Sequence, residues 1–289
     1  MSPTGKTDLP PNTFVHKMLD REFNKLRQFV YQYAGITLGD HKRDLLITRL
    51  SRRLRALRFS SFKEYLDYLD LKDNDNEIEK LVNCITTNVT GFYREINQFK
   101  LLEKSILDDY CAGMEKKGER HLKVWSAGSS SGEEAYTISI ELTEYFLRHT
   151  DWSFEIFASD IDTNILAKAR EAVYPVKTVA DIPAPLLKKY FLKGIDQNTD
   201  KVKLKSIIRD RVKYGIVNLI YDAYPYTDCD IIFCRNVMIY FSSENRRKII
   251  RKFYNSLKPG GFFFVGHSES VLEFKDEFDL VAASIYRKK

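Results

Sequence analysis

The hydrophobic pattern of the chain changes near residue 85, and this change constrains the fold more than any other feature. Before it, apolar residues such as Phe23, Leu26 and Val30 recur at helical spacing. After it, short apolar runs such as 230–234 alternate with helical stretches. A continuous apolar run of this length is typical of a strand buried on both faces of a parallel sheet. The sequence therefore predicts an all-helical N-terminal domain followed by an α/β domain.

The finer pattern predicts the order of the elements. We expect residues 1–12, which are polar and contain three prolines, to form a disordered leader, and residues 13–85 to form the helical domain. Residues 86–98 are predicted to be a linker and residues 99–289 the α/β domain. Predicted helices and strands of that domain are 99–111, 121–126, 133–148, 154–159, 163–172, 230–234, 244–257, 262–265 and a last strand near 278–286.

Strand–helix alternation predicts a Rossmann-like fold, in which helices cover both faces of a largely parallel sheet. Residues 174–217 interrupt it with three prolines, a short helix near 186–191 and two alternating segments, 201–205 and 211–217. We interpret this stretch as a small inserted antiparallel β-subdomain.

Bulk properties exclude several classes of protein. No apolar run is long enough to cross a bilayer, and the N-terminus lacks the apolar core of a signal peptide. The four cysteines form no CxxC pair and the five histidines are scattered, so no metal site is indicated. These features predict a soluble cytoplasmic protein with reduced thiols. The net charge of +6 suggests an acidic partner without naming one.

Two strand ends carry the first candidate binding residues. The stretch 124–134 is a strand, a small-residue turn containing Gly128, and the start of a helix. Ligands of doubly wound sheets lie at such carboxyl ends, although an ordinary turn would have the same composition. The turn is not the GxGxxG dinucleotide motif. Asp160 ends the next strand, where a ribose diol would be held, and Asp162 is placed to cap the following helix.

A third strand end and the linker add polar groups. Arg235 and Asn236 follow the apolar run, and Tyr240 lies at the same edge. Buried polar groups need partners, which could be a ligand or an internal hydrogen-bond network. The stretch 85–95 is dense in amide, hydroxyl and aromatic side chains together with Arg94. Its composition alone does not say what these side chains do.

The helix that begins near residue 40 has a basic face. Its arginines stand opposite a leucine stripe with almost no acidic residue among them; they include Arg49, Arg52, Arg53 and Arg55. Such a face is either simply solvated or steers an acidic partner towards the protein.

Taken together, these segments resemble the CheR family of chemotaxis-receptor glutamate methyltransferases. The resemblance runs from about Phe23 to near the C-terminus. Its main motifs are Thr86–Glu95, Trp125–Glu134, Ala158–Thr163, Phe233–Phe241 and Gly266–Glu269. It implies an S-adenosylmethionine-dependent methyltransferase domain with a small β-subdomain, preceded by an all-α domain.

The resemblance also implies roles for individual residues. Arg94 and Tyr240 match the residues that the family places near the reacting methyl group. The implied cofactor-binding residues are Asn88, Thr90, Arg94, Gly128, Glu134, Asp160, Asn218, Leu219, Cys234, Arg235 and Asn236. Arg49, Arg52, Arg53 and Arg55 are the expected substrate-binding residues, since receptor methylation regions are rich in glutamate.

The implied function is transfer of a methyl group from S-adenosylmethionine to glutamate side chains of the cytoplasmic helical domain of chemotaxis receptors, leaving S-adenosylhomocysteine. A receptor's C-terminal tether peptide could also bind through the β-subdomain. We expect a monomer that neither binds nucleic acid nor inserts into the membrane. The alternatives are a nucleic-acid methyltransferase, since a basic face also suits phosphates, and a non-catalytic module that senses S-adenosylmethionine.

Overall fold

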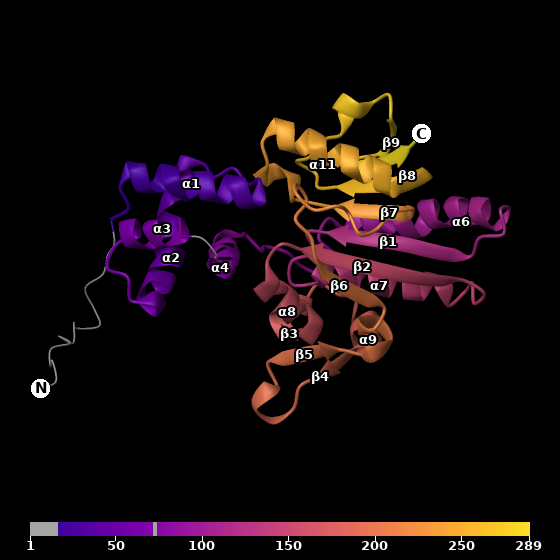
Figure 1. The fold of residues 1–289 in the computed structure, drawn as a ribbon. Helices are drawn as coiled ribbons and strands as arrows, with labels where there is room; N and C mark the ends of the chain where they lie inside the picture. The colour runs from indigo at the N-terminus through magenta and orange to yellow at the C-terminus, as the bar shows by residue number, and fades with distance from the viewer. Residues whose placement is uncertain (1–16, 72–73) are drawn as a thin grey trace, which may run out of the picture. The chain divides into compact units, whose positions relative to one another are not determined.

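The computed structural model describes residues 17–71 and 74–289, which fall into two compact units (Figure 1). One unit contains residues up to Tyr33 together with Leu38–Ile85, and the other contains Ala34–Thr37 and Thr86–Lys289. The expected leader, 1–12, lies outside the described residues. We call the two parts the helical unit and the sheet unit, and each is described by itself.

In its described residues, the helical unit is built from helices, as expected. They are α1 (Asp20–Ala34), a 3₁₀ turn η1 (Asp40–Lys42), α2 (Arg43–Leu57), α3 (Phe62–Leu69) and α4 (Asp75–Ile85). The Ser61 hydroxyl caps α3 by accepting a hydrogen bond from the Glu64 amide. Leucines at helical spacing on α2, namely Leu46, Leu50 and Leu54, are fully buried, which explains why this segment is an amphipathic helix.

The sheet unit contains a seven-stranded sheet in the order β6-β2-β1-β7-β8-β10-β9. Its strands are β1 (His121–Ala127), β2 (Ser153–Asp160), β6 (Val212–Ile216), β7 (Cys229–Cys234), β8 (Leu257–Val265), β9 (Phe278–Ala282) and β10 (Ile285–Lys288). The pairs β6-β2, β2-β1, β1-β7 and β7-β8 are parallel, and β10 is antiparallel to both neighbours. The predicted, largely parallel sheet is confirmed.

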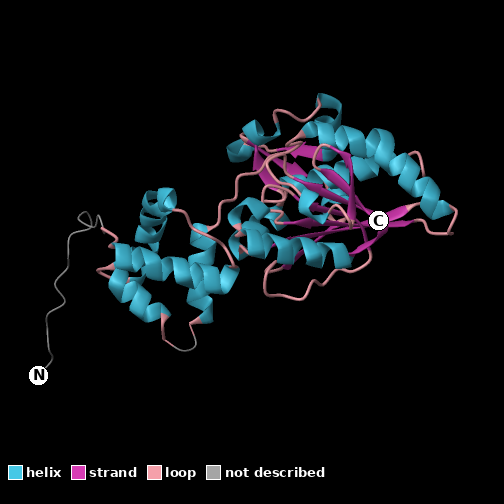
Figure 2. Cartoon of the chain, turned by 90° about the horizontal axis from the view of Figure 1, so that it is seen from above, coloured by secondary structure: helices cyan, strands magenta, loops and turns pink. Residues whose placement is uncertain are grey.

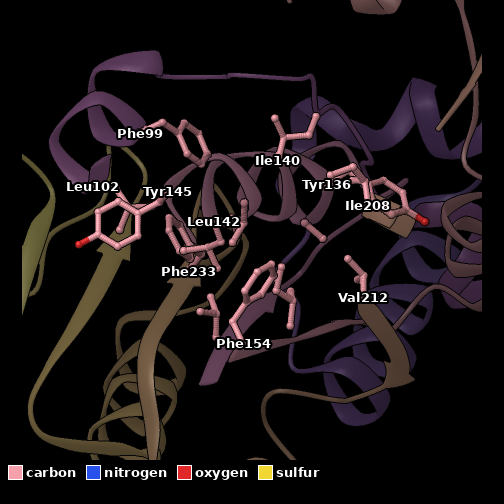
Figure 3. Close-up of a cluster of buried hydrophobic side chains, with 14 of the residues drawn as sticks. Phe99, Leu102, Tyr136, Ile140, Leu142, Tyr145, Phe154, Ile208, Val212 and Phe233 are labelled. Carbon is pink, nitrogen blue, oxygen red and sulfur yellow. The ribbon is translucent and has the colours of Figure 1, made fainter. Parts of the chain in front are cut away.

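The central strand β7 is buried along its whole length, which is why it is a continuous apolar run. Along β7, Ile231 and Phe233 join one hydrophobic layer, whereas Ile232 and Cys234 join the other. Figure 2 shows the strands gathered among helices. Figure 3 shows part of the first layer, in which the Phe99 and Phe233 rings stack with their centroids 6.0 Å apart.

Helices of the sheet unit connect the strands. They are α5 (Ile96–Leu101), a π-helical turn η2 (Leu102–Ile106), α6 (Leu107–Glu115), α7 (Glu133–Phe146), α8 (Thr163–Glu171), α9 (Ala184–Tyr190), α10 (Ser206–Arg209) and α11 (Ser243–Ser256). Short 3₁₀ turns are η3 (Val176–Val179), η4 (Asp196–Asn198), η5 (Met238–Tyr240) and η6 (Leu272–Phe274). In the described parts of the chain, every helix is too short or too polar to cross a membrane.

A second, antiparallel sheet has the order β3-β5-β4 and consists of β3 (Val173–Pro175), β4 (Phe191–Lys193) and β5 (Lys201–Leu204). It confirms an inserted antiparallel subdomain. The prediction that the alternating segment 211–217 belongs to it is wrong. That segment contains β6, which pairs in parallel with β2 at the edge of the large sheet. An edge strand has one polar face, so its alternation resembles that of a small antiparallel sheet.

Two further predictions need correction. The stretch 278–286 is not one strand but parts of two, β9 and β10, joined by a turn in which Ser284 has a φ of 61°. The helix expected at 99–111 begins earlier, at Ile96, and continues to Glu115 through the π-helical turn. Glu95, just before it, has a left-handed backbone that ends the preceding linker.

Candidate functional site

The candidate site lies where the strand order of the large sheet reverses. From β1 the chain continues outwards to β2 and β6, then returns to the opposite side of β1 as β7. In open α/β sheets, ligands bind at the carboxyl ends of the strands at such a switch point. Gly128 follows β1, Asp160 ends β2 and Arg235 follows β7. The topology therefore brings three of the predicted cofactor-binding residues to one edge.

The turn after β1 requires glycine at position 128. Gly128 has a φ of 75°, and a Cβ there would lie 2.4 Å from Val237 Cγ2. The amides of Gly128 and Ser129 both donate to the Ser159 carbonyl at 2.7 and 2.9 Å, which ties the turn to the end of β2. The turn is thus a fixed part of the sheet edge rather than a free loop.

Asp160 is a buried carboxylate at the centre of this edge. Its Oδ2 accepts from the Ser130 amide at 2.9 Å, and its Oδ1 accepts from the Asp162 amide at 3.0 Å. Burial raises its pKa to about 6, although these backbone hydrogen bonds oppose the rise. A carboxylate offers about four acceptor positions and the Ile161 amide also contributes a backbone hydrogen bond, so Asp160 retains capacity to accept a hydrogen bond from a diol.

Asp162 caps α8, as expected, by accepting hydrogen bonds from the amides of Asn164 and Ile165. Its other oxygen, Oδ2, accepts from Asn88 Nδ2 and Thr86 Oγ1, both at 2.7 Å. One side chain therefore holds both a helix terminus and the linker. Sequence reasoning identified only the cap.

The linker is fixed along this edge by further contacts. Besides Asn88, its Phe92 ring packs edge-on against Tyr174 and Phe191 of the small sheet, at 5.0 and 5.6 Å. Thr90 is half-buried two residues after Asn88. Arg94 is exposed, and its guanidinium donates to the Val89 carbonyl at 2.8 Å.

Arg235 is the most heavily bonded side chain of the site. It is 2% exposed and lies 3.0 Å from Glu95 Oε2 and 3.1 Å from Glu134 Oε2. It also donates to the Arg94 carbonyl. Its Nε is buried without a hydrogen-bond partner. Arg235 thus joins the end of β7, the first turn of α7 and the linker.

The two carboxylates beside Arg235 differ in their protonation behaviour. Burial raises the pKa of Glu134, against the opposing effect of the Arg235 charge, while the Ser126 hydroxyl donates to Oε1 at 2.7 Å. Burial also acts to raise the pKa of Glu95, but the hydrogen bond and charge of Arg235 outweigh it and the pKa of Glu95 is lowered. Glu95 is therefore the firmly ionised partner.

The other predicted site residues lie nearby. Asn236 has a φ of 59°, and its backbone amide donates to Glu269 Oε2 at 2.8 Å. Cys234 ends β7 and is fully buried, which raises the pKa of its thiol far above the usual range. Tyr240 is half-buried in η5, and its carbonyl accepts from the Thr37 amide at 2.9 Å.

Asn218 and Leu219 follow β6 at the far side of the edge. Asn218 Oδ1 accepts from the Ile220 amide at 3.0 Å, which makes a tight turn, and Leu219 is 7% exposed. Sequence reasoning missed Glu95 and Glu269 as parts of the site. The available signal was position, because Glu95 directly follows Arg94 and Glu269 ends the motif Gly266–Glu269.

The basic face of α2 is less available than its sequence suggests. Arg53 forms a bidentate ion pair with buried Glu77, which also accepts from the Tyr65 hydroxyl at 3.0 Å. Arg49 donates to the Cys84 and Ile85 carbonyls at 3.4 and 3.1 Å. Arg52 and Arg55 are exposed. The acidic partner of Arg53 comes from α4, where the pattern of α2 alone could not reveal it.

Comparison with known proteins assigns the chain. Residues 21–86 match the sequence model of the CheR methyltransferase all-alpha domain, and residues 88–287 match that of the CheR methyltransferase SAM binding domain. This chain belongs to the CheR methyltransferase family. Its curated relatives include the chemotaxis protein methyltransferase of Salmonella typhimurium, which is 37% identical over 98% of this chain and 96% of its own length.

Further CheR relatives cover similar lengths. The chemotaxis protein methyltransferase of Escherichia coli is 36% identical over 98% of this chain and 96% of its own, and chemotaxis protein methyltransferase 2 of Pseudomonas aeruginosa is 38% identical over 92% of each. Among solved structures, a glycopeptide N-methyltransferase complexed with sinefungin aligns with a TM-score of 0.32 and 16% identity, over 54% of this chain and 47% of its own. The relatives give no support to a nucleic-acid methyltransferase or a non-catalytic sensor.

S-adenosylmethionine is the cofactor of this family, and the residues at the sheet edge fit it. The donor set pairs one buried cation, Arg235, with Glu95 and Glu134, and Asp160 adds a further carboxylate. This surplus of negative charge suits a cofactor whose net charge is positive. Two buried polar atoms without partners, Ser129 Oγ and Arg235 Nε, lie at the same strand ends. Within residues 17–71 and 74–289, His, Cys, Asp and Glu side chains form no metal-binding group.

Proposed function

We propose that this CheR-family protein transfers the methyl group of S-adenosylmethionine to glutamate carboxylates of chemotaxis receptors. The observation that carries the proposal is its match, over nearly the whole of both chains, to curated chemotaxis protein methyltransferases at 36–38% identity. Support from the structure comes from the carboxylate-rich strand ends and the exposed Arg94 beside them.

In this proposal, the strand ends bind the cofactor. Asp160 accepts the ribose hydroxyls, Glu134 faces the cationic amino acid part, and Asn218 and Leu219 flank the adenine. Gly128 allows the backbone to approach, since any side chain there would meet Val237. Asn88, Thr90, Cys234, Arg235 and Asn236 complete the boundary. When bound, the cofactor supplies an electrophilic methyl group on a positively charged sulfur.

The glutamate carboxylate of the substrate is itself the nucleophile that attacks the methyl group. A glutamate carboxylate is ionised at pH 7, so no protein base is needed to generate it. The carboxylate and the sulfonium neutralise each other as the bond forms, and this step is favoured where water is excluded. The protein's main contribution is then to hold the two groups in line.

Arg94 and Tyr240 are assigned to that positioning. Arg94 is exposed and linker-borne, so it can orient an incoming carboxylate by hydrogen bonds. The Tyr240 hydroxyl can steer the same carboxylate or the methyl group. Arg52 and Arg55 on α2 are the exposed basic groups that would attract a glutamate-rich receptor segment at low salt.

The partner in this proposal is the cytoplasmic helical domain of a chemotaxis receptor, so the enzyme would act in the cytoplasm. We propose that it acts there as a monomer. A receptor tether peptide binding at the β-subdomain is a further part of the proposal. The antiparallel sheet β3-β5-β4 supports it, because strands at sheet edges can accept an added peptide strand.

A methyl-transfer assay tests the proposal. The protein is incubated with methyl-labelled S-adenosylmethionine and a purified receptor cytoplasmic fragment, and the product is treated with alkali. We expect label on the fragment that is released as methanol, because carboxyl methyl esters hydrolyse in base. A fragment whose glutamates are replaced by alanine is the control. Alkali-stable label, or label that enters added nucleic acid instead, would refute the proposal.

A further inference from the structure

Arg94 is flanked by two residues with unusual backbone conformations. Tyr93 has a φ of 54° and Glu95 a φ of 57°. Both lie in the left-handed region, a backbone conformation that residues other than glycine rarely adopt without compensating contacts. Such conformations persist where the surrounding structure holds them, and they are found at functional sites. The contacts that hold these two residues therefore decide where Arg94 lies.

The Tyr93 side is held by α7. Its amide donates to Thr137 Oγ1 at 3.2 Å, and its hydroxyl donates to Glu141 Oε1 at 2.7 Å. The Tyr93 side chain is buried, and its ring also packs edge-on against Phe99 at 6.0 Å. These contacts fix the chain immediately before Arg94.

The Glu95 side is held through its carboxylate. Oε2 accepts from the Arg235 guanidinium at 3.0 Å, and Oε1 accepts from the His267 amide at 3.3 Å with Asn236 Nδ2 at 3.5 Å. The same Arg235 guanidinium donates to the Arg94 carbonyl. Glu95 thus holds the Arg235 guanidinium by an ion pair, and the same guanidinium holds the main chain of Arg94 by a hydrogen bond.

We propose that Glu95 is a positioning residue for methyl transfer, acting through Arg235 on the main chain of Arg94. The inference rests on the proposed function, because it takes Arg94 to orient the substrate carboxylate. Glu95 itself touches neither substrate nor cofactor in this scheme. Its role is to keep Arg94 in one place before the substrate arrives, so that no ordering is needed during the reaction.

Glutamine at position 95 is the sharpest perturbation. Both carboxylate oxygens accept from donors, so the NH₂ group of a glutamine meets a donor whichever way the amide faces. Glu95→Gln keeps the size of the side chain yet weakens the hold on Arg235. Glu134 still pairs with Arg235 at 3.1 Å, so the buried positive charge keeps one ion-pair partner and the variant is expected to fold.

The expected result is a separation of turnover from binding. A displacement of about 1 Å can lower turnover about a hundredfold, so we expect Glu95→Gln to lose tenfold to a hundredfold in kcat. Calorimetry with S-adenosylhomocysteine should show a loss of binding much smaller than the loss of kcat, because Glu134 still holds Arg235. Glu95→Asp, which keeps the charge, should recover part of the lost kcat. Glu103→Gln, which removes a surface carboxylate paired with Arg148, is the matched control and should change neither.

A double-mutant cycle with Arg94 completes the test. If Glu95 acts through Arg94, Glu95→Gln should cost little further turnover in an Arg94→Ala background, or in Arg94→Lys if the residual rate of the alanine variant is too low to measure. Additive losses would overturn the proposal. Unchanged kcat in Glu95→Gln would overturn it as well, as would equal losses of turnover and S-adenosylhomocysteine binding. Full activity in Arg94→Ala would instead remove Arg94 from the proposed mechanism.

Discussion

Asp160→Asn offers a direct test of how the sheet edge is organised. Asp160 is buried, and burial raises its pKa from the ordinary 3.8 to about 6. One pKa unit corresponds to about 1.4 kcal/mol, so keeping this group ionised in the folded protein costs roughly 3 kcal/mol. Asparagine carries no charge at any pH, so the substitution removes this cost of ionisation. Its NH₂ group must also face a backbone donor, because both carboxylate oxygens accept from amides, but that cost does not change with pH. The stability of Asp160→Asn relative to the unsubstituted protein should therefore rise as the pH rises.

The pH dependence fixes the sign of this effect. Below about pH 4, Asp160 is protonated in both folded and unfolded chains, so its ionisation costs nothing. As the pH rises from about 4 to 6, the unfolded chain loses the proton first, and the stability of the folded protein falls relative to the asparagine variant. Above about pH 6 this change in the stability difference reaches its plateau, which is up to about 3 kcal/mol above the value at pH 4. Ligand binding should show the reverse preference, because a diol favours the ionised carboxylate.

Urea unfolding of the ligand-free proteins at pH 4, 5, 6 and 7 measures the stability difference, and calorimetry with S-adenosylhomocysteine measures binding. We expect the free energy of unfolding of Asp160→Asn, relative to the unsubstituted protein, to rise with pH between 4 and 6. We also expect binding by the unsubstituted protein to weaken about tenfold from pH 7 to pH 5. Asp200→Asn, at an exposed aspartate, is the control. A stability difference that does not change with pH would refute the reasoning about burial.

Further predictions concern α2 and the turn after β1. Arg53→Gln leaves buried Glu77 without its ion-pair partner, so urea unfolding should show a free energy of unfolding lower by about 3 kcal/mol. Arg52→Gln, at an exposed position, should change this free energy by less than about 0.5 kcal/mol. It should instead raise the KM for receptor, and only at low salt. Equal destabilisation by both would contradict the ion pair. Gly128→Ala should cost about 1–3 kcal/mol and weaken S-adenosylhomocysteine binding, because its Cβ would meet Val237; adding Val237→Ala should restore part of the loss in the same assays. If Val237→Ala restores none of the lost stability, the loss caused by Gly128→Ala does not come from a clash with Val237.

Much of the fold could be predicted because its signals are local. Phe23, Leu26 and Val30, whose spacing predicted a helix, lie in α1, and the apolar run 230–234 lies within the central strand β7. Segment 211–217 was misassigned because partner choice is not local. Nothing in an alternating segment states whether its neighbour is β2 or β5.

For the candidate site, too, some features could be predicted from the sequence and others could not. Positions of strand ends follow from the strand pattern, so Gly128, Asp160 and Arg235 could be brought to one edge before any coordinates were known. Pairings over long sequence distances could not, since the Arg235–Glu95 contact spans 140 positions and Arg53–Glu77 joins two helices. Such pairs depend on the folded arrangement of elements rather than on spacing within one of them.

The four residues Ala34–Thr37 lie within the first 85 residues, between α1 and α2, but belong to the sheet unit. Ile36 forms a bridge with Phe241, the Thr37 amide bonds to Tyr240, and the Gly35 carbonyl accepts from Asn245. The two units are therefore interleaved rather than strung one after the other. A chain shortened to begin at Thr86 would lose these backbone contacts at Tyr240 and Phe241, so deleting the first 85 residues removes part of the sheet unit as well as the helical unit.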